Sequence, residues 1–213
     1  MNDPKMQNNR FNLKPETLQD LQESLYDWQL YNFGDQDNER VLMGICEEAG
    51  ELCHSHLKLE QSIRGTPAEH EAGMRDAVGD IMIYLLNYMS GLGEKVQVFV
   101  AREDVEKPEN PKVIRDSVLT VFRMVGKVAD EPKSMSRIGH LITAMIYLCA
   151  LKGWDLEGVT RDTWEQVGQR DWKQFPETGF APQAAAPTQV QQAPTQPEQV
   201  PAAQPAPQQP PQG

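Results

Sequence analysis

The sequence predicts an all-α fold, a helical bundle of about six helices followed by a disordered C-terminal tail. Apolar residues recur at the 3.6-residue spacing of an α-helix through residues 15–178, and no stretch alternates apolar and polar residues convincingly. Proline and glycine residues fall between the periodic stretches, where they end one helix or begin the next.

The first helix is expected directly after Pro15. Its apolar face is formed by Leu18, Leu21, Leu25 and Trp28. The stretch EKVQVFVARE (94–103) alternates briefly, but a lone strand is rarely stable, so we expect a loop there. The other helices are expected at residues 38–60, 67–91, 112–128, 133–152 and 155–173.

Composition separates the helical domain from its ends. Residues 179–213 hold more than half of the 16 prolines and a single charge, Glu198. Such a segment cannot bury enough apolar surface to offset its ordering entropy, so we expect a disordered Pro/Gln/Ala-rich tail. Residues 1–14 are expected to be a flexible N-terminus, which leaves residues 15–178 as one domain.

The net charge of -11 lies almost entirely on that domain, because the tail is nearly neutral. This charge argues against nucleic-acid binding, which is driven by phosphate neutralisation, and it suits a protein that gathers divalent cations. Three cysteines without framework spacing indicate unpaired thiols in a reducing compartment. No apolar run approaches a membrane span or a signal core, so we expect a cytoplasmic protein without membrane contact.

The chain contains a weak internal repeat. LMGICEEAGELC (42–53) aligns with VLTVFRMVGKVA (118–129), and MIYLL (82–86) aligns with MIYLC (145–149). The second copy keeps the apolar framework but has none of the carboxylates, so we expect a degenerate two-helix repeat; chance similarity between amphipathic helices is the alternative. Met124, Lys127, Gly139 and Thr143 stand opposite Glu48, Glu51, Asp76 and Asp80.

Two carboxylates border the apolar face of the helix expected at 38–60. An α-helix turns about 100° per residue, which puts Glu48 at the edge of the apolar arc and Glu51 one step further round. Both can therefore reach the same point beside the core. The arc is formed by Val41, Leu42, Ile45, Cys46, Ala49, Leu52, Cys53 and Leu57.

The next expected helix is apolar around most of its circumference, as is typical of a buried helix. The exception is a narrow stripe with Asp76 and Asp80, which Tyr84 and Asn87 continue. Like charges at i and i+4 repel, so a cation is expected to offset them. Oxygen-only ligands suit Mg²⁺ or Mn²⁺, and a solvated acidic face is the alternative. The expected ligands are Glu48, Glu51, Asp76 and Asp80.

Cys53, His54 and His56 are not expected to form a metal site. Two positions that are two residues apart on a helix point to opposite sides, so the histidines cannot share an ion. We expect a core cysteine beside two surface histidines.

These residues resemble the motifs of the MazG-like all-α NTP pyrophosphohydrolase superfamily, which also includes dimeric dUTPases and phosphoribosyl-ATP pyrophosphatases. The family pattern is E-E-x-x-E on one helix and E-x-x-D on the next. Glu47, Glu48 and Glu51 match the first element, and Asp80 matches the end of the second. The ending WEQVGQRDWKQFPETG (164–179) is also similar to the closing helix of MazG-like proteins.

The chain departs from the family at Ala77, which stands where the second motif has Glu. Asp76, four residues before Asp80, is expected to take over that role. The resemblance implies Mg²⁺-dependent hydrolysis of a nucleoside triphosphate to the monophosphate and pyrophosphate, with Glu48 and Glu51 as catalytic residues. A non-catalytic nucleotide-binding or regulatory module on the same fold is the alternative. The expected substrate-binding residues are Lys58, Arg64, Tyr84 and Asn87.

The resemblance also implies a homodimer, because MazG-like chains usually pair to complete a four-helix core. The internal repeat offers an alternative, a monomer in which the second copy supplies the rest of that core.

Overall fold

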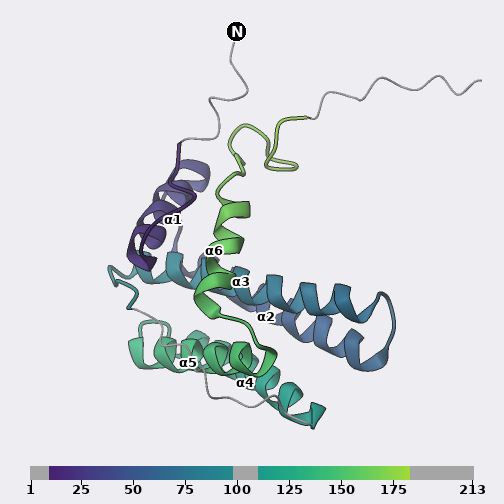
Figure 1. Ribbon diagram of the computed structural model, residues 1–213. Helices are drawn as coiled ribbons and strands as arrows, with labels where there is room; N and C mark the ends of the chain where they lie inside the picture. Colours follow the sequence, from purple (N-terminus) through teal and green to yellow (C-terminus); the bar gives the residue numbers. More distant parts are fainter. Residues whose placement is uncertain (1–9, 98–109, 183–213) are drawn as a thin grey trace, which may run out of the picture. The chain divides into compact units, whose positions relative to one another are not determined.

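A computed structural model describes residues 10–97 and 110–182 of the protein (Figure 1). Those residues form six α-helices and no strand, which confirms the all-α prediction. The predicted tail from residue 183 and the second half of the predicted 94–103 loop lie outside the described residues. The helices are α1 (Leu18–Phe33), α2 (Asn38–Gln61), α3 (Pro67–Gly91), α4 (Pro111–Asp130), α5 (Met135–Lys152) and α6 (Leu156–Val167).

Side-chain caps fix where α1 and α3 begin. Thr17 and Asp20 form a capping box at α1, and Thr66 and Glu69 form the same box at α3. In each box the threonine hydroxyl accepts from a free amide of the first turn, while the acid accepts from the backbone N–H of the threonine. The Glu69 carboxylate is therefore bound to Thr66 at the start of α3.

The end of α6 differs from the prediction. The helix stops at Val167 instead of residue 173, because the chain after Gly168 forms turns that pack against α1. The Asp171 N–H donates to the Gly179 carbonyl at 2.7 Å, and Trp28 Nε1 donates to the Arg170 carbonyl at 2.9 Å. The compact unit accordingly extends to Ala181 instead of residue 178.

The end of the segment expected to be a flexible N-terminus is packed. Trp164 Nε1 donates to the Asn12 carbonyl at 2.9 Å, and Phe11 and Leu13 lie against the core. Only residues 1–9 of that segment lie outside the described part of the chain.

Two helical hairpins form the centre of the fold (Figure 1). In the first, α2 and α3 run antiparallel, because Gly44 faces Tyr84 near one end and Ser55 faces Gly73 near the other. In the second, α4 packs against α5, and α4 also packs against α2. Helices α1 and α6 cover α3, which explains why α3 is buried around most of its surface.

The burial pattern follows the internal repeat. Ile45, Ala49 and Leu52 are buried in α2, and the equivalent Val121, Val125 and Val128 are buried in α4. Leu85 and Leu86 of α3 are likewise buried, as are the equivalent Leu148 and Cys149 of α5. The two hairpins therefore use equivalent residues for their core faces.

Ion pairs join the two hairpins at their edges. Arg115 of α4 binds Glu60 of α2 through two nitrogens, with distances of 2.8 to 3.0 Å to the carboxylate oxygens. Lys152 of α5 binds Glu71 of α3. Both pairs link helices that are far apart in sequence, so they help to fix the second hairpin against the first.

The apolar arc predicted for α2 is partly wrong. Cys46 and Leu57 are exposed, whereas His56, expected at the surface, is buried. The reason is the position of α4, which covers the His56 side of α2 and leaves the next strip of the helix uncovered. The His56 Nε2 lies 3.5 Å from the Glu60 carboxylate, whereas its Nδ1 has no hydrogen-bond partner, and burial lowers the pKa of the imidazole against the opposing charge of Glu60. Cys53 is half-buried and His54 is exposed, as expected for the latter.

A close crossing fixes α6 on α3. A Cβ atom at Gly79 would overlap the Thr163 hydroxyl and lie 2.9 Å from the Thr163 Cβ, so only glycine allows the two helices to approach this closely. The crossing positions the chain that follows α6, including Arg170.

Gly79→Ala is expected to lower the free energy of unfolding by about 1–3 kcal/mol, because the added methyl group forces α6 away from α3. Gly126→Ala is the control. Nothing lies within 4 Å of a Cβ at Gly126, in the interior of α4, so alanine should stabilise the protein by about 0.5–1 kcal/mol. Urea denaturation of both variants checks the sign, and equal effects would contradict the close crossing.

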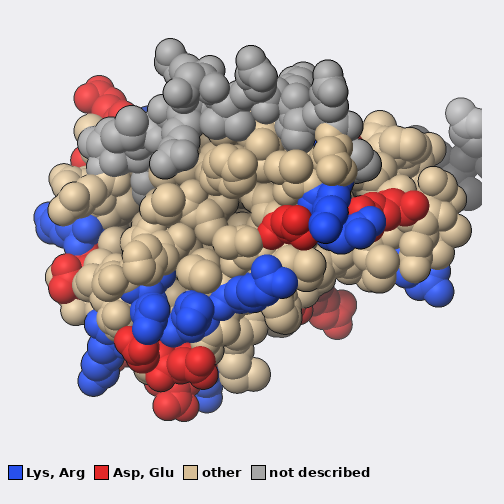
Figure 2. All heavy atoms as spheres, turned by 90° about the horizontal axis from the view of Figure 1, so that it is seen from below, with Lys and Arg blue, Asp and Glu red and all other residues tan. Residues whose placement is uncertain are grey.

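The surface seen from the side of α4 and α5 carries both signs of charge. Lys and Arg side chains and Asp and Glu side chains border a centre of other residues (Figure 2). The net negative charge therefore does not make this face uniformly acidic. In the described part of the chain, we find no helix whose length and apolar character would let it span a membrane.

Candidate functional site

A cavity of about 340 Å³ lies among α1, α2, α3 and the segment after α6. Its volume falls within the range of small-molecule sites. Two carboxylates, an arginine and several aromatic side chains share this one space. It is lined by Trp28, Gln29, Phe33, Gln36, Glu48, Asp80, Ile83, Tyr84, Asn87, Val167, Arg170 and Trp172.

The surroundings of both carboxylates in the cavity disfavour their charged form. Burial raises the pKa of Glu48 to about 8, and the neighbouring charges of Asp80, Glu51, Glu47 and Asp76 add to this rise in that order. At neutral pH the uncharged form of Glu48 is therefore favoured in the protein alone.

Asp80 shows the same effect more weakly. Burial raises the pKa of Asp80 to about 6, with further increases from the charges of Asp76 and Glu51, while Arg170 acts in the opposite direction. The four carboxylates predicted as cation ligands thus lie close enough to repel one another.

Their exposure differs from the predicted buried stripe. Glu48 and Asp80 are half-buried, but Glu51 and Asp76 are exposed and do not line the cavity. Asp76 instead lines a second cavity of about 340 Å³ between α3 and α6, together with Ala72, Gly73, Arg75, Thr163 and Gln166.

As the side chains stand, no three His, Cys, Asp or Glu residues of the described chain form a group able to hold a metal ion. The chemistry of Glu48, Glu51, Asp76 and Asp80 nevertheless suits a hard divalent cation, since they offer only oxygen and each adds to unbalanced negative charge. The expected metal site thus stays a prediction.

Asn87 and Tyr84 form the wall of the cavity beyond Asp80. Asn87 is only 7% exposed, and its Oδ1 has no hydrogen-bond partner. A buried amide without a partner is costly, so a ligand that donates a hydrogen bond to it would bind favourably. The Tyr84 ring packs against Gly44, and burial, followed by the charges of Glu48 and Glu47, raises the pKa of its phenol.

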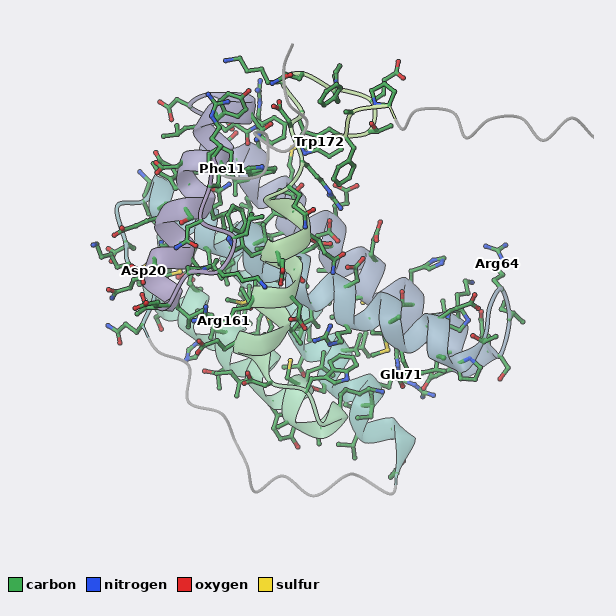
Figure 3. The ribbon with its side chains drawn as sticks, turned by 45° about the horizontal axis from the view of Figure 1, so that its top comes forward. Phe11, Asp20, Arg64, Glu71, Arg161 and Trp172 are labelled. Atoms are coloured by element: carbon green, nitrogen blue, oxygen red, sulfur yellow. The ribbon has the colours of Figure 1, made fainter. Side chains whose placement is uncertain are left out.

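Two of the four predicted substrate-binding residues, Lys58 and Arg64, lie outside the cavity. Lys58 does not line the cavity, and its ammonium donates to Gln61 at 3.3 Å. Arg64 lies in the turn between α2 and α3, far from Trp172 in Figure 3. The structure therefore separates both from the carboxylates of the cavity.

Arg170 and Trp172 are cavity residues that sequence reasoning missed. Hydrogen bonds to α1 hold this segment: the Arg170 carbonyl accepts from Trp28 Nε1, and the Trp172 N–H donates to Asn32 Oδ1 at 2.7 Å. The expected continuation of α6 to residue 173 concealed this arrangement. Gly168, two residues before Arg170, is the sequence signal for an earlier helix end.

In the metal-free protein, the melting temperature is expected to fall as the pH rises from 5 to 8. Because the pKa of Glu48 is raised to about 8 from an ordinary value near 4.5, the folded state holds a proton that the unfolded state releases, and stability is lost through that window. Mg²⁺ should reverse the loss at pH 8, where the carboxylates can bind it. Glu48→Gln should flatten the pH dependence and reduce the Mg²⁺ effect; identical melting curves for variant and wild type would contradict both assignments.

The arrangement combines an acidic end, an arginine and a wall of aromatic and amide groups. It can accommodate a ligand that has a planar polar part and an anionic part held by Arg170 or by a cation. Comparisons of the chain with protein-family models, curated proteins and solved structures give no match.

Proposed function

We propose that the protein is a nucleoside triphosphate pyrophosphohydrolase that depends on Mg²⁺ and releases the monophosphate and pyrophosphate. The observation that carries the proposal is the single cavity in which Glu48, Asp80, Arg170 and the unpartnered Asn87 amide lie together. A nucleoside triphosphate has phosphates for Arg170 and for a cation held by the carboxylates, and a base and a sugar that can donate to the Asn87 amide. The resemblance of residues 47–51 and 76–80 to MazG-like motifs supports the same reaction.

Glu48, Glu51, Asp76 and Asp80 would hold the cation, for which Mn²⁺ is the other candidate. When bound, such an ion neutralises charge on the phosphate oxygens and lowers the pKa of a water molecule. Since Glu51 and Asp76 are exposed, they are free to turn toward the cavity without breaking a packed contact.

Glu48 is the proposed proton acceptor for the attacking water, with Glu51 beside it. In the metal-free protein burial raises the pKa of Glu48 to about 8, and a cation bound beside it would favour the charged carboxylate, which is the form that accepts a proton. Arg170 is the proposed ligand of the phosphate oxygens, because its planar guanidinium offers several donors at fixed angles.

The nucleoside is proposed to bind between the aromatic residues of the cavity. Trp28, Tyr84 and Trp172 come from three different segments and offer flat apolar surfaces for a base. The Asn87 Oδ1 would accept a hydrogen bond from an N–H group of the base or a hydroxyl group of the sugar.

A panel of nucleoside triphosphates tests the proposal. Each is incubated with the full chain and Mg²⁺, and chromatography follows monophosphate and pyrophosphate. Equal amounts of the two products, abolished by EDTA, are expected for at least one nucleotide. Release of orthophosphate with the diphosphate would contradict the reaction type.

A non-catalytic nucleotide-binding module is the second candidate. Ala77 in place of the family's acid and the lack of a preformed group of three carboxylates in the described residues favour it. Calorimetric binding of a nucleotide without any turnover in the same panel would select this alternative.

Cytoplasmic location is also a proposal. Its support is the set of three free thiols, Cys46, Cys53 and Cys149, which fits a reducing compartment.

Arg170→Met is expected to raise KM by about tenfold or more, since a hydrogen bond to a charged group contributes roughly 1.5–3 kcal/mol. Arg64→Met is the matched control, because it removes the same side chain from a turn outside the cavity. Steady-state kinetics of the two variants decide which arginine binds substrate. A larger effect at Arg64 would restore the assignment made from sequence.

A further inference from the structure

The chain after α6 carries two of the side chains that line the cavity, and we call residues 170–179 the closing segment. The Arg170 guanidinium carbon lies 5.8 Å from the centroid of the Trp172 ring. Within residues 10–97 and 110–182 no salt bridge involves Arg170, so no carboxylate there holds its guanidinium. Asp171 stands between these two residues and does not line the cavity. Any role of Asp171 at the site therefore acts through its neighbours.

One face of α1 holds the closing segment on both sides of Asp171. The Trp28 ring donates to the carbonyl just before Asp171, and the Asn32 side chain accepts from the N–H just after it. Between them, the Tyr31 hydroxyl donates to Asp171 Oδ2 at 3.2 Å. The three α1 residues share a face of the helix, because they are three and four positions apart. Their contacts therefore fix the direction of the closing segment against a single rigid element.

Asp171 also closes the segment on itself. Its Oδ1 accepts from the Gln174 N–H and its Oδ2 from Gln174 Nε2, both at 2.9 Å. The Asp171 N–H donates to the Gly179 carbonyl at 2.7 Å, and the Asp171 carbonyl accepts from the Phe175 N–H at 2.9 Å. Both carboxylate oxygens and both backbone groups of Asp171 are therefore bonded, and removal of the carboxylate would break three hydrogen bonds at once.

Gly179, at the other end of the closing segment, packs against the Arg170 side chain. A Cβ atom at Gly179 would lie 2.9 Å from the Arg170 Cβ and 3.1 Å from its Cγ, so only glycine allows this approach. The φ angle of Gly179 is +76°, which also favours glycine. Since the Asp171 N–H binds the Gly179 carbonyl, Asp171 holds in place the residue on which the stem of Arg170 rests.

We infer that Asp171 is a positioning residue of the proposed active site, which holds the Arg170 guanidinium and the Trp172 ring at the cavity. Its carboxylate fixes the closing segment on Tyr31 of α1, and its backbone N–H keeps Gly179 beside Arg170. The inference rests on the proposed function, because it requires Arg170 to bind the phosphates and Trp172 to bind the base. Side chains that are already held in place lose less conformational entropy when a substrate binds, so the expected effect is on substrate affinity.

Hydrogen exchange of the full chain, without nucleotide or metal, tests the positioning itself. In Asp171→Ala the backbone amides of residues 172–179 should exchange at least about tenfold faster than in the wild type, while those of α3 keep the wild-type rate. Asp155→Ala is the matched control, because it removes a carboxylate that accepts from the Gly158 N–H at 2.7 Å, at the opposite end of α6. Unchanged exchange of residues 172–179 in Asp171→Ala overturns the inference, whether or not the protein hydrolyses a nucleotide.

Steady-state kinetics with a nucleotide that the wild type hydrolyses tests the consequence for the site. Asp171→Ala should raise KM about tenfold and change kcat less than about threefold, because it weakens binding in the ground and transition states alike. Asp155→Ala should keep KM within about twofold of the wild type. In the double variant Asp171→Ala with Arg170→Met, KM should rise by less than the product of the two single increases, because both changes remove the same contact. A full product overturns the inference.

Asp171→Asn separates positioning from a direct effect of the charge. Asparagine keeps an oxygen for the Gln174 N–H and can donate to the Tyr31 hydroxyl, so exchange and KM should stay within about threefold of the wild type. A rise in KM as large as that of Asp171→Ala would mean that the negative charge itself binds or repels the substrate, and the positioning role would be wrong. Absence of turnover by the wild type contradicts the proposed function instead, and hydrogen exchange then decides alone whether Asp171 holds the closing segment.

Discussion

Asp80→Asn is expected to lower turnover by at least about a thousandfold, or roughly 4 kcal/mol of transition-state stabilisation. Asp80 lies in the cavity beside Glu48 and Arg170, where a carboxylate can hold a cation against the phosphates. Asparagine keeps the shape of the side chain and removes its charge. Because burial raises the pKa of Asp80 to about 6, the charge disfavours the metal-free fold, so the melting temperature should be unchanged or higher.

The control is the equivalent residue of the second hairpin. Thr143→Asn introduces the same side chain on an exposed face of α5 and should leave turnover within about twofold of the wild type. Glu51→Gln should behave like Asp80→Asn, and Lys127→Gln should behave like Thr143→Asn. If the changes in the second hairpin cost as much as those in the first, the active and degenerate copies have been assigned wrongly.

The helices were predictable because each carries its own signal. The Thr17 and Thr66 caps, Pro67 and the Gly153 end depend on local chemistry that is visible in a few neighbouring residues. Gly168 is a local signal for the end of α6, but the path of the chain after it depends on distant residues. Trp28 and Asn32 of α1 bind that backbone, and no local pattern predicts a partner about 140 positions away.

The candidate site shows the same division. Helical periodicity placed Glu48 and Asp80 beside the apolar faces of two successive predicted helices, and the structure places both in one cavity. Arg170 could not be assigned in this way, because its place in the cavity results from the α3–α6 crossing at Gly79 and the contacts of the following segment with α1. For His56, periodicity alone gave the wrong side, since the position of α4 decides which part of α2 is covered.

Asp76→Ala is expected to lower turnover by at least about a hundredfold, or roughly 2.7 kcal/mol. The charge of Asp76 adds to the rise in the pKa of both Glu48 and Asp80, and its exposed carboxylate is expected to turn toward a cation that those two residues bind. Its neighbour Arg75 binds Asp162 of α6 at 2.6 Å, which leaves Asp76 without that arginine as a partner. Near-normal turnover of this variant, measured at saturating Mg²⁺, would show that Asp76 is a surface charge at the edge of the helix and does not bind the cation.

The double change Asp76→Ala with Ala77→Glu separates the two positions for the missing acid. Ala77 is 2% exposed and lies within the hydrophobic core, so a glutamate there would have to be buried among apolar side chains. Burying a carboxyl group without a partner costs several kcal/mol, roughly 2–7 even when it is neutral. We therefore expect a lower melting temperature and no recovery of turnover. Recovery would mean that a glutamate at position 77 reaches the cation, as the second-motif glutamate does in the resembled family. Asp76 would then not be its replacement.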